Sequence, residues 1–383
     1  MTTRDFTANV ISASKVVPDG NYKDSKASGV WDINEALDLI KGGNWPNAAN
    51  INPAAFVDAL FQTHLYDGTN SAKTITNGID LSGKGGLVWT KRRNSSRDHI
   101  LFDSERGTSS RLTITTNAAA NQTYSITMNS DGYAWSGADN DVNVSGSEYV
   151  SWTFRKQPKF FDIVTYTGNN TVRTISHNLG SVPGMIIIKR TDSNDIWYVY
   201  HRSLGEGKRL KLHQTTAAED DDATMDNTAP TSTVFTIGAN VNHVNADGST
   251  FVAYLFAHND DDGGFGEPGD QDIIKCGTYT GNNSTTGPVI DLGFEPQWVF
   301  IKHTDSGSGG GDASFIFDNM RGVVTGGNDN SLSPNASNDE QTNANSLEFN
   351  ASGFQLTRAD SSVNGSSKNY IYMAIRRGGM QTP

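Results

Sequence analysis

The chain has 383 residues, of which 35% are hydrophobic, and its formal net charge is −12. Its length suits several domains of ordinary size, while the negative charge argues against a nucleic-acid partner because it would repel the phosphate backbone. With one cysteine, Cys276, the chain cannot form an intramolecular disulfide framework.

The first 62 residues differ from the rest and carry the strongest helical signals of the sequence. One helix is predicted over Asp32–Lys41, before two glycines, and a second over Pro53–Phe61. The first helix places three apolar residues at helical spacing, namely Ile33, Leu37 and Ile40. Because so short a helix needs a surface from elsewhere to bury its apolar side, we expect residues 1–62 to be a docking segment.

The residues before this helix are polar with scattered apolar positions, which suits either a disordered arm or one that orders on a partner. They lack the apolar run of a signal peptide, and no stretch of the chain is apolar enough to span a bilayer. We therefore expect a chain that is made in the cytoplasm and is not inserted into a membrane.

After residue 62 the sequence repeats one pattern three times. Each copy opens with a Tyr-x-Gly turn, contains an apolar run that ends in lysine, and closes with a Val-Asn pair before a long aromatic run. The opening tyrosines are Tyr66, Tyr166 and Tyr279, the lysines are Lys91, Lys189 and Lys302, and the asparagines are Asn143, Asn245 and Asn364. Because this order is kept throughout, we interpret the segments as three copies of one domain.

Runs rich in valine, isoleucine and aromatic residues, bounded by glycine, asparagine and proline, predict strands joined by turns. In the closing run of the first copy Val150, Trp152 and Phe154 alternate with polar residues, as in a strand with one buried face. We predict a mainly β chain of three tandem β-sandwich-like domains behind the docking segment. Their expected ranges are 63–158, 159–262 and 263–383.

Between the second and third copies, residues 259–272 are rich in aspartate and glycine. Their carboxylates could bind calcium, but three consecutive aspartates depart from the Asp-x-Asp-x-Asp-Gly spacing of a calcium loop. A solvated linker is the alternative interpretation, and the sequence leaves both open.

Two tryptophans, Trp135 and Trp197, stand beside turn residues and are candidates for exposed rings that could stack on a sugar. The alternative is that both rings belong to the core. The sequence contains no zinc-ligand spacing, phosphate-binding loop or Gly-x-Ser-x-Gly motif. We therefore expect neither an enzyme nor a cofactor or metal, although a pair of distant carboxylates for glycoside cleavage remains the alternative.

The second copy, with Tyr166–Gly168, Ile175–Gly180 and Val182–Lys189, resembles a repeat domain of virion proteins from marine tailed phages, notably cyanophages. The N-terminal segments Gly29–Glu35 and Gly43–Pro46, which contain Trp31 and Trp45, are similar to the opening of phage fibre-like proteins. This resemblance implies a structural protein of the virion, made in the host cytoplasm and attached to the tail or a fibre.

The expected partners are other virion proteins of the tail or capsid and further copies of the chain. One alternative is a capsid decoration protein or head fibre, and another is a lectin-like adhesin that binds a host surface glycan. The candidate interaction residues are Trp31, Ile33, Leu37, Ile40, Trp45, Trp135 and Trp197.

Overall fold

The computed structural model describes residues 56–121, 124–266, 269–305 and 314–378. The chain divides into two units, Met1–Ala55 and Phe56–Pro383, and the described residues, here called the body, belong to the second. The predicted helix over Asp32–Lys41 and the candidates Trp31, Ile33, Leu37, Ile40 and Trp45 lie outside the described residues.

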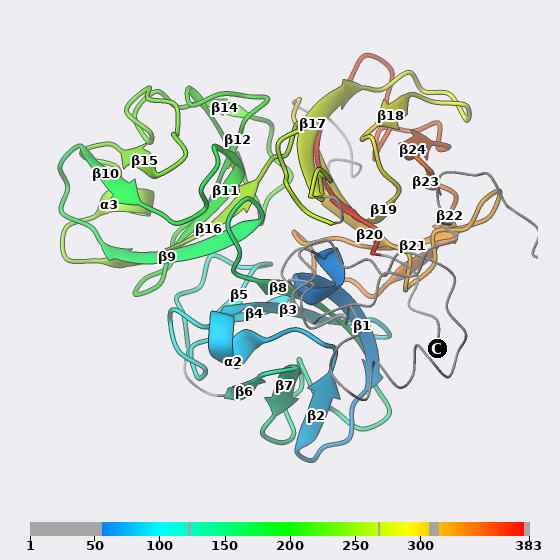
Figure 1. Cartoon of the computed structure of the whole chain (residues 1–383), viewed down its shortest axis with the longest axis horizontal. Helices are drawn as coiled ribbons and strands as arrows, with labels where there is room; N and C mark the ends of the chain where they lie inside the picture. Colours follow the sequence, from blue (N-terminus) through cyan, green and yellow to red (C-terminus); the bar gives the residue numbers. More distant parts are fainter. Residues whose placement is uncertain (1–55, 122–123, 267–268, 306–313, 379–383) are drawn as a thin grey trace, which may run out of the picture. The chain divides into compact units, whose positions relative to one another are not determined.

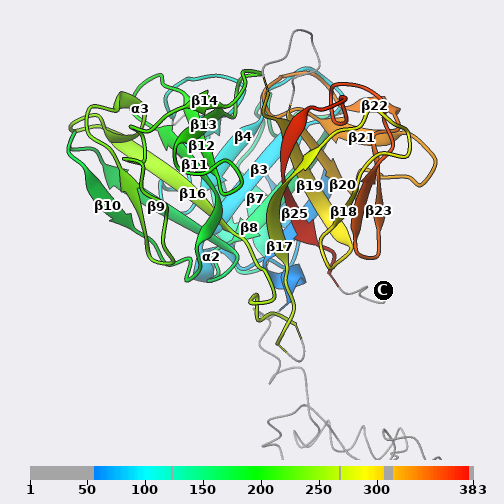
Figure 2. The same cartoon turned by 90° about the horizontal axis from the view of Figure 1, so that it is seen from above.

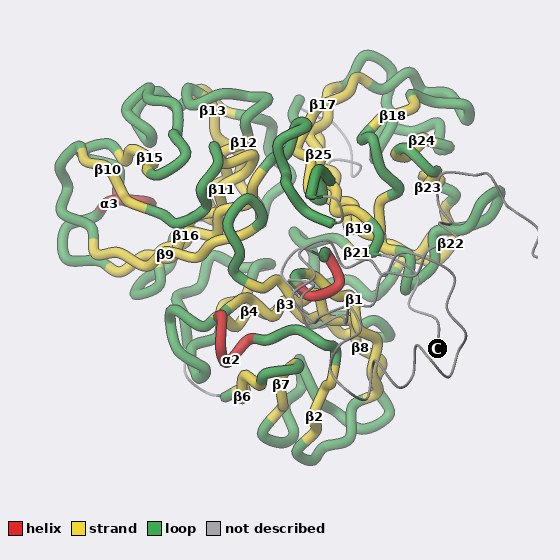
Figure 3. The backbone as a smooth tube through the Cα atoms, viewed as in Figure 1, coloured by secondary structure: helices red, strands yellow, loops and turns green. Residues whose placement is uncertain are grey.

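Strands and loops make up nearly all of the body, which confirms the mainly β prediction (Figure 3). The strands form three lobes, each with one large and one small antiparallel sheet (Figure 1). Lobe 1 has the sheets β1-β8-β3-β4-β5 and β2-β7-β6. Its elements are η3 (Val57–Ala59), β1 (Phe61–Asp67), β2 (Lys73–Thr76), α2 (Leu81–Lys84), β3 (Gly86–Arg92), β4 (Ile100–Asp103), β5 (Leu112–Thr113), β6 (Ile126–Asn129), β7 (Gly132–Trp135) and β8 (Glu148–Arg155).

Lobe 2 has the sheets β14-β13-β12-β11-β16-β9 and β10-β15. Its elements are β9 (Phe161–Thr167), β10 (Arg173–Ser176), β11 (Pro183–Arg190), β12 (Trp197–His201), β13 (Lys208–Lys211), β14 (Glu219–Asp220), β15 (Val234–Ile237), α3 (Asn242–Asn245) and β16 (Thr250–Ala257). Lobe 3 has the sheets β17-β25-β19-β20-β21-β22 and β18-β24-β23. Its elements are β17 (Ile274–Thr280), β18 (Val289–Asp291), β19 (Pro296–His303), β20 (Ser314–Asp318), β21 (Asp329–Leu332), β22 (Gln341–Ala344), β23 (Leu347–Asn350), β24 (Gly353–Leu356) and β25 (Asn369–Arg376).

In every lobe the first and last strands pair in the same register. The opening tyrosine lies opposite an aromatic residue of the last strand, and the paired rings stack with centroids 5.1, 5.2 and 5.0 Å apart. The pairs are Tyr66 with Tyr149, Tyr166 with Phe251, and Tyr279 with Tyr370. This shared register defines which residues of the three lobes are equivalent.

The repeated asparagine is fully buried in each lobe and holds the loop that follows the first strand. In lobe 2 its amide nitrogen donates to the carbonyl of Thr171 at 2.8 Å, and its Oδ1 accepts from the backbone N–H of Asn169 at 3.0 Å. Asn143 and Asn364 make the same two bonds with the equivalent residues. The sequence repeat is therefore a structural clasp, because a buried amide of this kind must be fully hydrogen-bonded.

The lobes join head to tail at three seams, named by the lobes they join. One backbone N–H···O bond recurs at equivalent positions of all three seams, at 2.9, 2.8 and 2.8 Å. The bonds run from Ala120 to Thr191 in seam 1/2, from Ala218 to Thr304 in seam 2/3, and from Glu340 to Arg93 in seam 3/1. Because the last bond returns to lobe 1, the lobes close a ring with quasi-threefold symmetry.

A buried polar contact also crosses each seam at the end of equivalent strands. Tyr254 Oη donates to Asp103 at 2.6 Å in seam 1/2, and Trp152 Nε1 donates to Asp318 at 3.0 Å in seam 3/1. In seam 2/3 the equivalent residue is His201, whose Nε2 lies 3.1 Å from the carbonyl of Tyr372.

One hydrophobic core joins all three lobes. The ring of Phe154 in lobe 1 lies 5.5 Å from Phe256 in lobe 2 and 6.0 Å from Trp298 in lobe 3. The lobes thus share a central core, while lobes 1 and 3 each have a further hydrophobic cluster of their own. Leu60 and Phe61 are also buried there, so the body begins before residue 63, where we placed the boundary.

Candidate functional site

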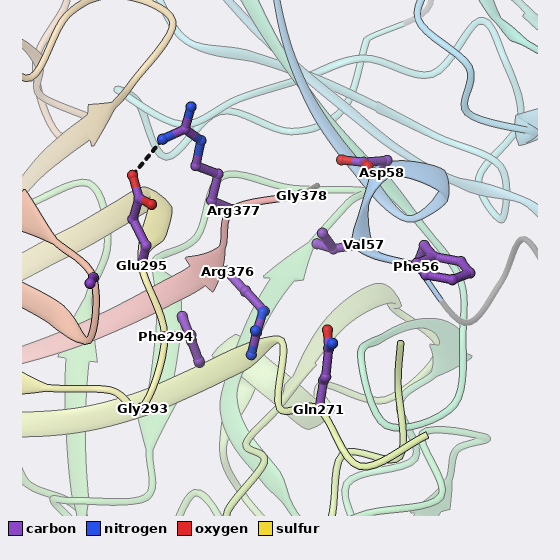
Figure 4. A pocket seen from close by; sticks show the side chains of 11 residues that line it. Phe56, Val57, Asp58, Gln271, Gly293, Phe294, Glu295, Arg376, Arg377 and Gly378 are labelled. Carbon is purple, nitrogen blue, oxygen red and sulfur yellow. Dashed lines mark hydrogen bonds and ion pairs between the residues drawn. The ribbon is translucent and has the colours of Figure 1, made fainter. Parts of the chain in front are cut away.

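A pocket of about 510 Å³ lies where the chain enters and leaves the body (Figure 4). Figure 2 shows these two ends of the body on the same side, here called the chain-end pole. Gly378 lies so close to Asp58 that a side chain on the glycine would overlap the carboxylate. The lining residues are Phe56, Val57, Asp58, Gln271, Gly293, Phe294, Glu295, Ala351, Arg376, Arg377 and Gly378.

Backbone hydrogen bonds fix the last strand of the body against this pocket. The N–H of Arg376 donates to Ile273 at 2.8 Å, and the N–H of Arg377 donates to Glu295 at 2.7 Å. On the opposite wall the turn before β19 contains Gly293, whose φ of 72° favours glycine. These elements place two acidic side chains, Asp58 and Glu295, and two basic ones, Arg376 and Arg377, around the cavity.

The charges of the pocket are only partly neutralised. Arg377 pairs with Glu295 at 2.6 Å, but both side chains are about half exposed and the pair is worth little. The Arg376 guanidinium lies 5.8 Å from the ring centre of Phe294 and donates to the carbonyl of Asp272 at 3.3 Å. Among the described residues no carboxylate pairs with Arg376.

Burial raises the pKa of the Asp58 carboxyl above its ordinary value. The pocket thus combines an arginine without an acidic partner, a partly desolvated acid and the apolar surfaces of Phe56 and Phe294. Such a mixture suits contact with polypeptide, which carries polar and apolar groups close together.

The equivalent place in lobe 2 holds a smaller pocket of about 340 Å³, lined by Ser181, Arg202, His258 and Asp260 among others. Burial lowers the pKa of His258 to about 4, and its Nδ1 accepts from the backbone N–H of Cys276 at 3.1 Å. In lobe 1 the short helix α2 replaces this turn, capped by Asp80 through the N–H of Gly83 at 2.7 Å. The chain-end pole is therefore less symmetrical than the seams.

Of the two alternatives for Trp135 and Trp197, the core interpretation is confirmed and the exposed one is wrong, because both side chains are fully buried. Trp135 packs edge-on against Tyr133 inside lobe 1, with ring centres 5.0 Å apart. Trp197 belongs to seam 1/2, where its Nε1 donates to the carbonyls of Thr113 and Thr116 at 3.2 and 3.0 Å. Both residues lie in strands with little exposed surface, and every residue of β12 is buried.

The acidic segment 259–272 folds back on itself. Asn259 Oδ1 accepts from the N–H of Ile273 at 3.0 Å, and Asp272 accepts from the N–H groups of Asp261 and Gly263 at 2.9 and 3.1 Å. In the described part of the chain no three His, Cys, Asp or Glu side chains are grouped so as to hold a metal ion. The described residues of this segment therefore form a hydrogen-bonded loop, in which Asp260, Asp261 and Asp262 are exposed to solvent, as the linker interpretation expects.

Sequence reasoning missed the seam residues Arg93 and Glu340. Arg93 Nη2 lies 2.7 Å from Glu340 Oε2, and this pair closes the ring between lobes 3 and 1. Their equivalents in the other seams are small, namely Thr191, Thr304, Ala120 and Ala218. The sequence signal for these two residues is that they differ from the equivalent residues of the other copies, whereas our predictions rested on residues that the copies share.

The body is thus a three-lobed β-scaffold with a mixed polar and apolar pocket at its chain ends. A family model described as a domain of unknown function (DUF7483) matches residues 58–377, and the chain belongs to that family. One model spans all three lobes, in keeping with their common core. A search of curated proteins found no significant match. None of the helices described is long and apolar enough to cross a membrane.

Proposed function

We propose that the protein is a non-enzymatic structural component of a tailed-phage particle, tail-associated or fibre-like, and joined to its neighbours at the chain-end pole. The observation that carries this proposal is the closed ring, in which the repeated residues serve as clasps and seam bonds. The phage setting rests on the resemblance of the second copy and the N-terminal segments to virion proteins.

The seams give the body the rigidity that a particle component needs. In seam 3/1 Arg321 is fully buried, with its Nε 2.6 Å from Asp318 and its Nη1 3.2 Å from Glu340. In seam 1/2 Arg106 makes the equivalent contact with Asp103 at 2.6 Å. Removing one partner of such buried pairs leaves an uncompensated charge, which is strongly destabilising.

The chain-end pole is the proposed attachment side because residues 1–55, the main part of the predicted docking segment, join the body there. Any protein that holds this segment comes close to the pocket at Phe56–Asp58. The free hydrogen-bonding capacity of Arg376 and the desolvated Asp58 provide polar contacts for such a neighbour. Assembly with further copies of the chain is part of the same proposal.

A lectin that binds glycans by ring stacking is less well supported. That alternative predicts exposed aromatic rings at loop ends, whereas all the described tryptophan, tyrosine and phenylalanine residues are buried or partly buried. A capsid decoration protein is the second candidate, because a rigid body carried on an attachment segment suits both placements.

Immunogold labelling of intact virions with an antibody against lobe 3 tests the placement. Label on the tail supports the proposal, and label on the head supports the decoration protein. If the particles carry no label and mass spectrometry finds none of this chain in them, both placements are refuted.

Deleting residues 1–55 tests the attachment side. The truncated chain should fold but no longer join particles, and a chain lacking residues 379–383 is the control for a change at the same pole. The pocket is tested by Asp58→Asn with Arg376→Gln, with Arg97→Gln as the exposed control. Incorporation of the truncated chain at the level of the full chain would show that the docking segment lies elsewhere.

A further inference from the structure

A second groove, of about 520 Å³, lies in seam 1/2. Thr165 and Thr167 of β9 and Thr250 of β16 form its floor, and Glu105 and Ala120 of lobe 1 stand on the facing wall. Thr191 and Asp192, which follow β11, close a third side.

The floor is one face of the large sheet of lobe 2. Thr167 lies opposite Thr250 in the ladder, and Thr191 Oγ1 lies 2.6 Å from Thr250 Oγ1, so threonines continue across neighbouring strands. The alternating residues Tyr166 and Phe251 stack on the other face. Backbone groups of a sheet point along its plane toward the next strand. A ligand on this face therefore meets side-chain hydroxyls and carboxylates.

Seam 1/2 carries short side chains where seam 3/1 carries long ones, and it shares this feature with seam 2/3, where Thr304 and Ala218 stand at the same positions. In seam 3/1 Arg93 contacts Glu340 at 2.7 Å and Glu148 at 3.8 Å, and these three side chains occupy the corresponding space. The equivalent residues of seam 1/2 are Thr191, Ala120 and Thr250.

The chemistry of the groove selects a neutral ligand rich in hydroxyl groups. Thr165, Thr167 and Thr250 are exposed, and a threonine hydroxyl can both donate and accept. Glu105 and Asp192 accept hydrogen bonds, and each has a cation 2.8 Å away, Lys156 and Arg190 respectively. Arg106 also lines the groove, but it pairs with Asp103 at 2.6 Å, so the groove presents little net charge to a ligand.

An apolar or extended peptide finds few contacts here, since Tyr166 and Phe251 line the groove but stack on each other, and the backbone groups of the sheet point along its plane. We infer that this groove binds a short neutral oligosaccharide through hydroxyl and carboxylate groups. The inference does not depend on the placement of the protein in a particle.

The test uses the full chain with 13C-labelled threonine methyl groups and three probes, namely maltotriose, cellotriose and chitotriose at millimolar concentration. At least one probe should shift the methyl signals of Thr165, Thr167, Thr191 and Thr250. The variant Thr191→Arg with Ala120→Glu copies the filled seam 3/1 and should weaken binding by about tenfold or more, which corresponds to about 1.4 kcal/mol.

Thr174→Val, on the exposed side of β10, is the matched control and should bind as the wild type does. Thr165→Val with Thr167→Val removes two hydroxyls without filling the groove, and it should also weaken binding if the filled variant fails to fold. Failure of all three sugars to move these four methyl signals would overturn the inference. So would shifts that persist in a folded filled variant, or a response to a Gly-Ser peptide alone.

Discussion

The repeated asparagines allow a direct test of whether the three lobes unfold as one unit. Asn245 Nδ2 donates to the carbonyls of Thr171 and Gly238 at 2.8 and 2.7 Å, and its Oδ1 accepts from Asn169 at 3.0 Å. Alanine at this position leaves these backbone groups without their partner. Each unsatisfied buried group costs about 1–3 kcal/mol, and water reaching the loop offsets part of this, so we expect a loss of roughly 2–4 kcal/mol.

The same substitution can be made once in each lobe, as Asn143→Ala, Asn245→Ala and Asn364→Ala. Since the lobes share a core, each variant should shift one common transition by a similar amount. Guanidinium unfolding followed by far-UV circular dichroism and tryptophan fluorescence measures this, because every lobe contains at least one buried tryptophan. Asn328→Ala, at an exposed loop position, is the control and should change little.

Two outcomes of these unfolding experiments would contradict the prediction. Three separable transitions, of which each substitution moves only one, would show that the lobes are independent domains and that the shared core contributes little. A single transition that only one of the three variants shifts would instead show that the clasps are not equivalent in energy.

Three further predictions concern the seams and the buried titratable groups. Burial lowers the pKa of His201 and His243 from 6.5 to about 4. The free energy of unfolding should therefore fall as the pH drops from 6.5 to 4, by up to about 1.4 kcal/mol per pH unit for each histidine. His201→Gln should reduce this slope when unfolding is measured as a function of pH. Burial lowers the pKa of Lys91 and Lys189 from 10.5 to about 8. Between pH 8 and 10.5 the unfolded chain holds more protons than the folded one, so the free energy of unfolding should rise with pH. Lys189→Met should remove part of that rise in the same assay. Arg93→Thr leaves the nearly buried Glu340 with Arg321 alone and should cost roughly 1–3 kcal/mol. Adding Glu340→Ala also removes one of the two acidic partners of the buried Arg321, so the double variant should be less stable than the single one, and a double variant as stable as the wild type would contradict this account.

The strand pattern of the body was predictable because it depends on local signals. The alternation in Val150–Phe154 and the position of the opening tyrosines predicted which runs are strands, and the structure pairs them in one register in every lobe. The prediction that this strand has one buried face is wrong, because Ser151 and Thr153 are as buried as Val150 and Trp152. The predicted second helix shows where local signals failed. A 3₁₀ turn ends at Ala59, and Phe61 already pairs with Phe154 in β1, because tertiary pairing overrides a short helical preference.

The seams were not predictable in the same way, since each joins residues far apart in the chain. Glu340 meets Arg93 across 247 positions of sequence. The sequence left open whether Trp197 is exposed or buried, because nothing local shows that its indole N–H bonds to the Thr113 carbonyl in seam 1/2. The pocket residues Arg376 and Asp58 likewise come from opposite ends of the body, and no local pattern connects them.

The comparison of equivalent positions separates scaffold from candidate site. Where all three lobes keep a residue, as at Asn143, Asn245 and Asn364, the structure gives it an internal partner, so the repetition itself marks a structural role. Where the lobes differ at an equivalent position, the fold common to all three does not require one particular residue there. Arginine at position 93 fills its seam, while threonine at position 191 leaves a groove. Since Thr304 repeats Thr191, the residue that departs from the repeat is Arg93, and its departure gives seam 3/1 an ion pair that the other two seams lack at this position.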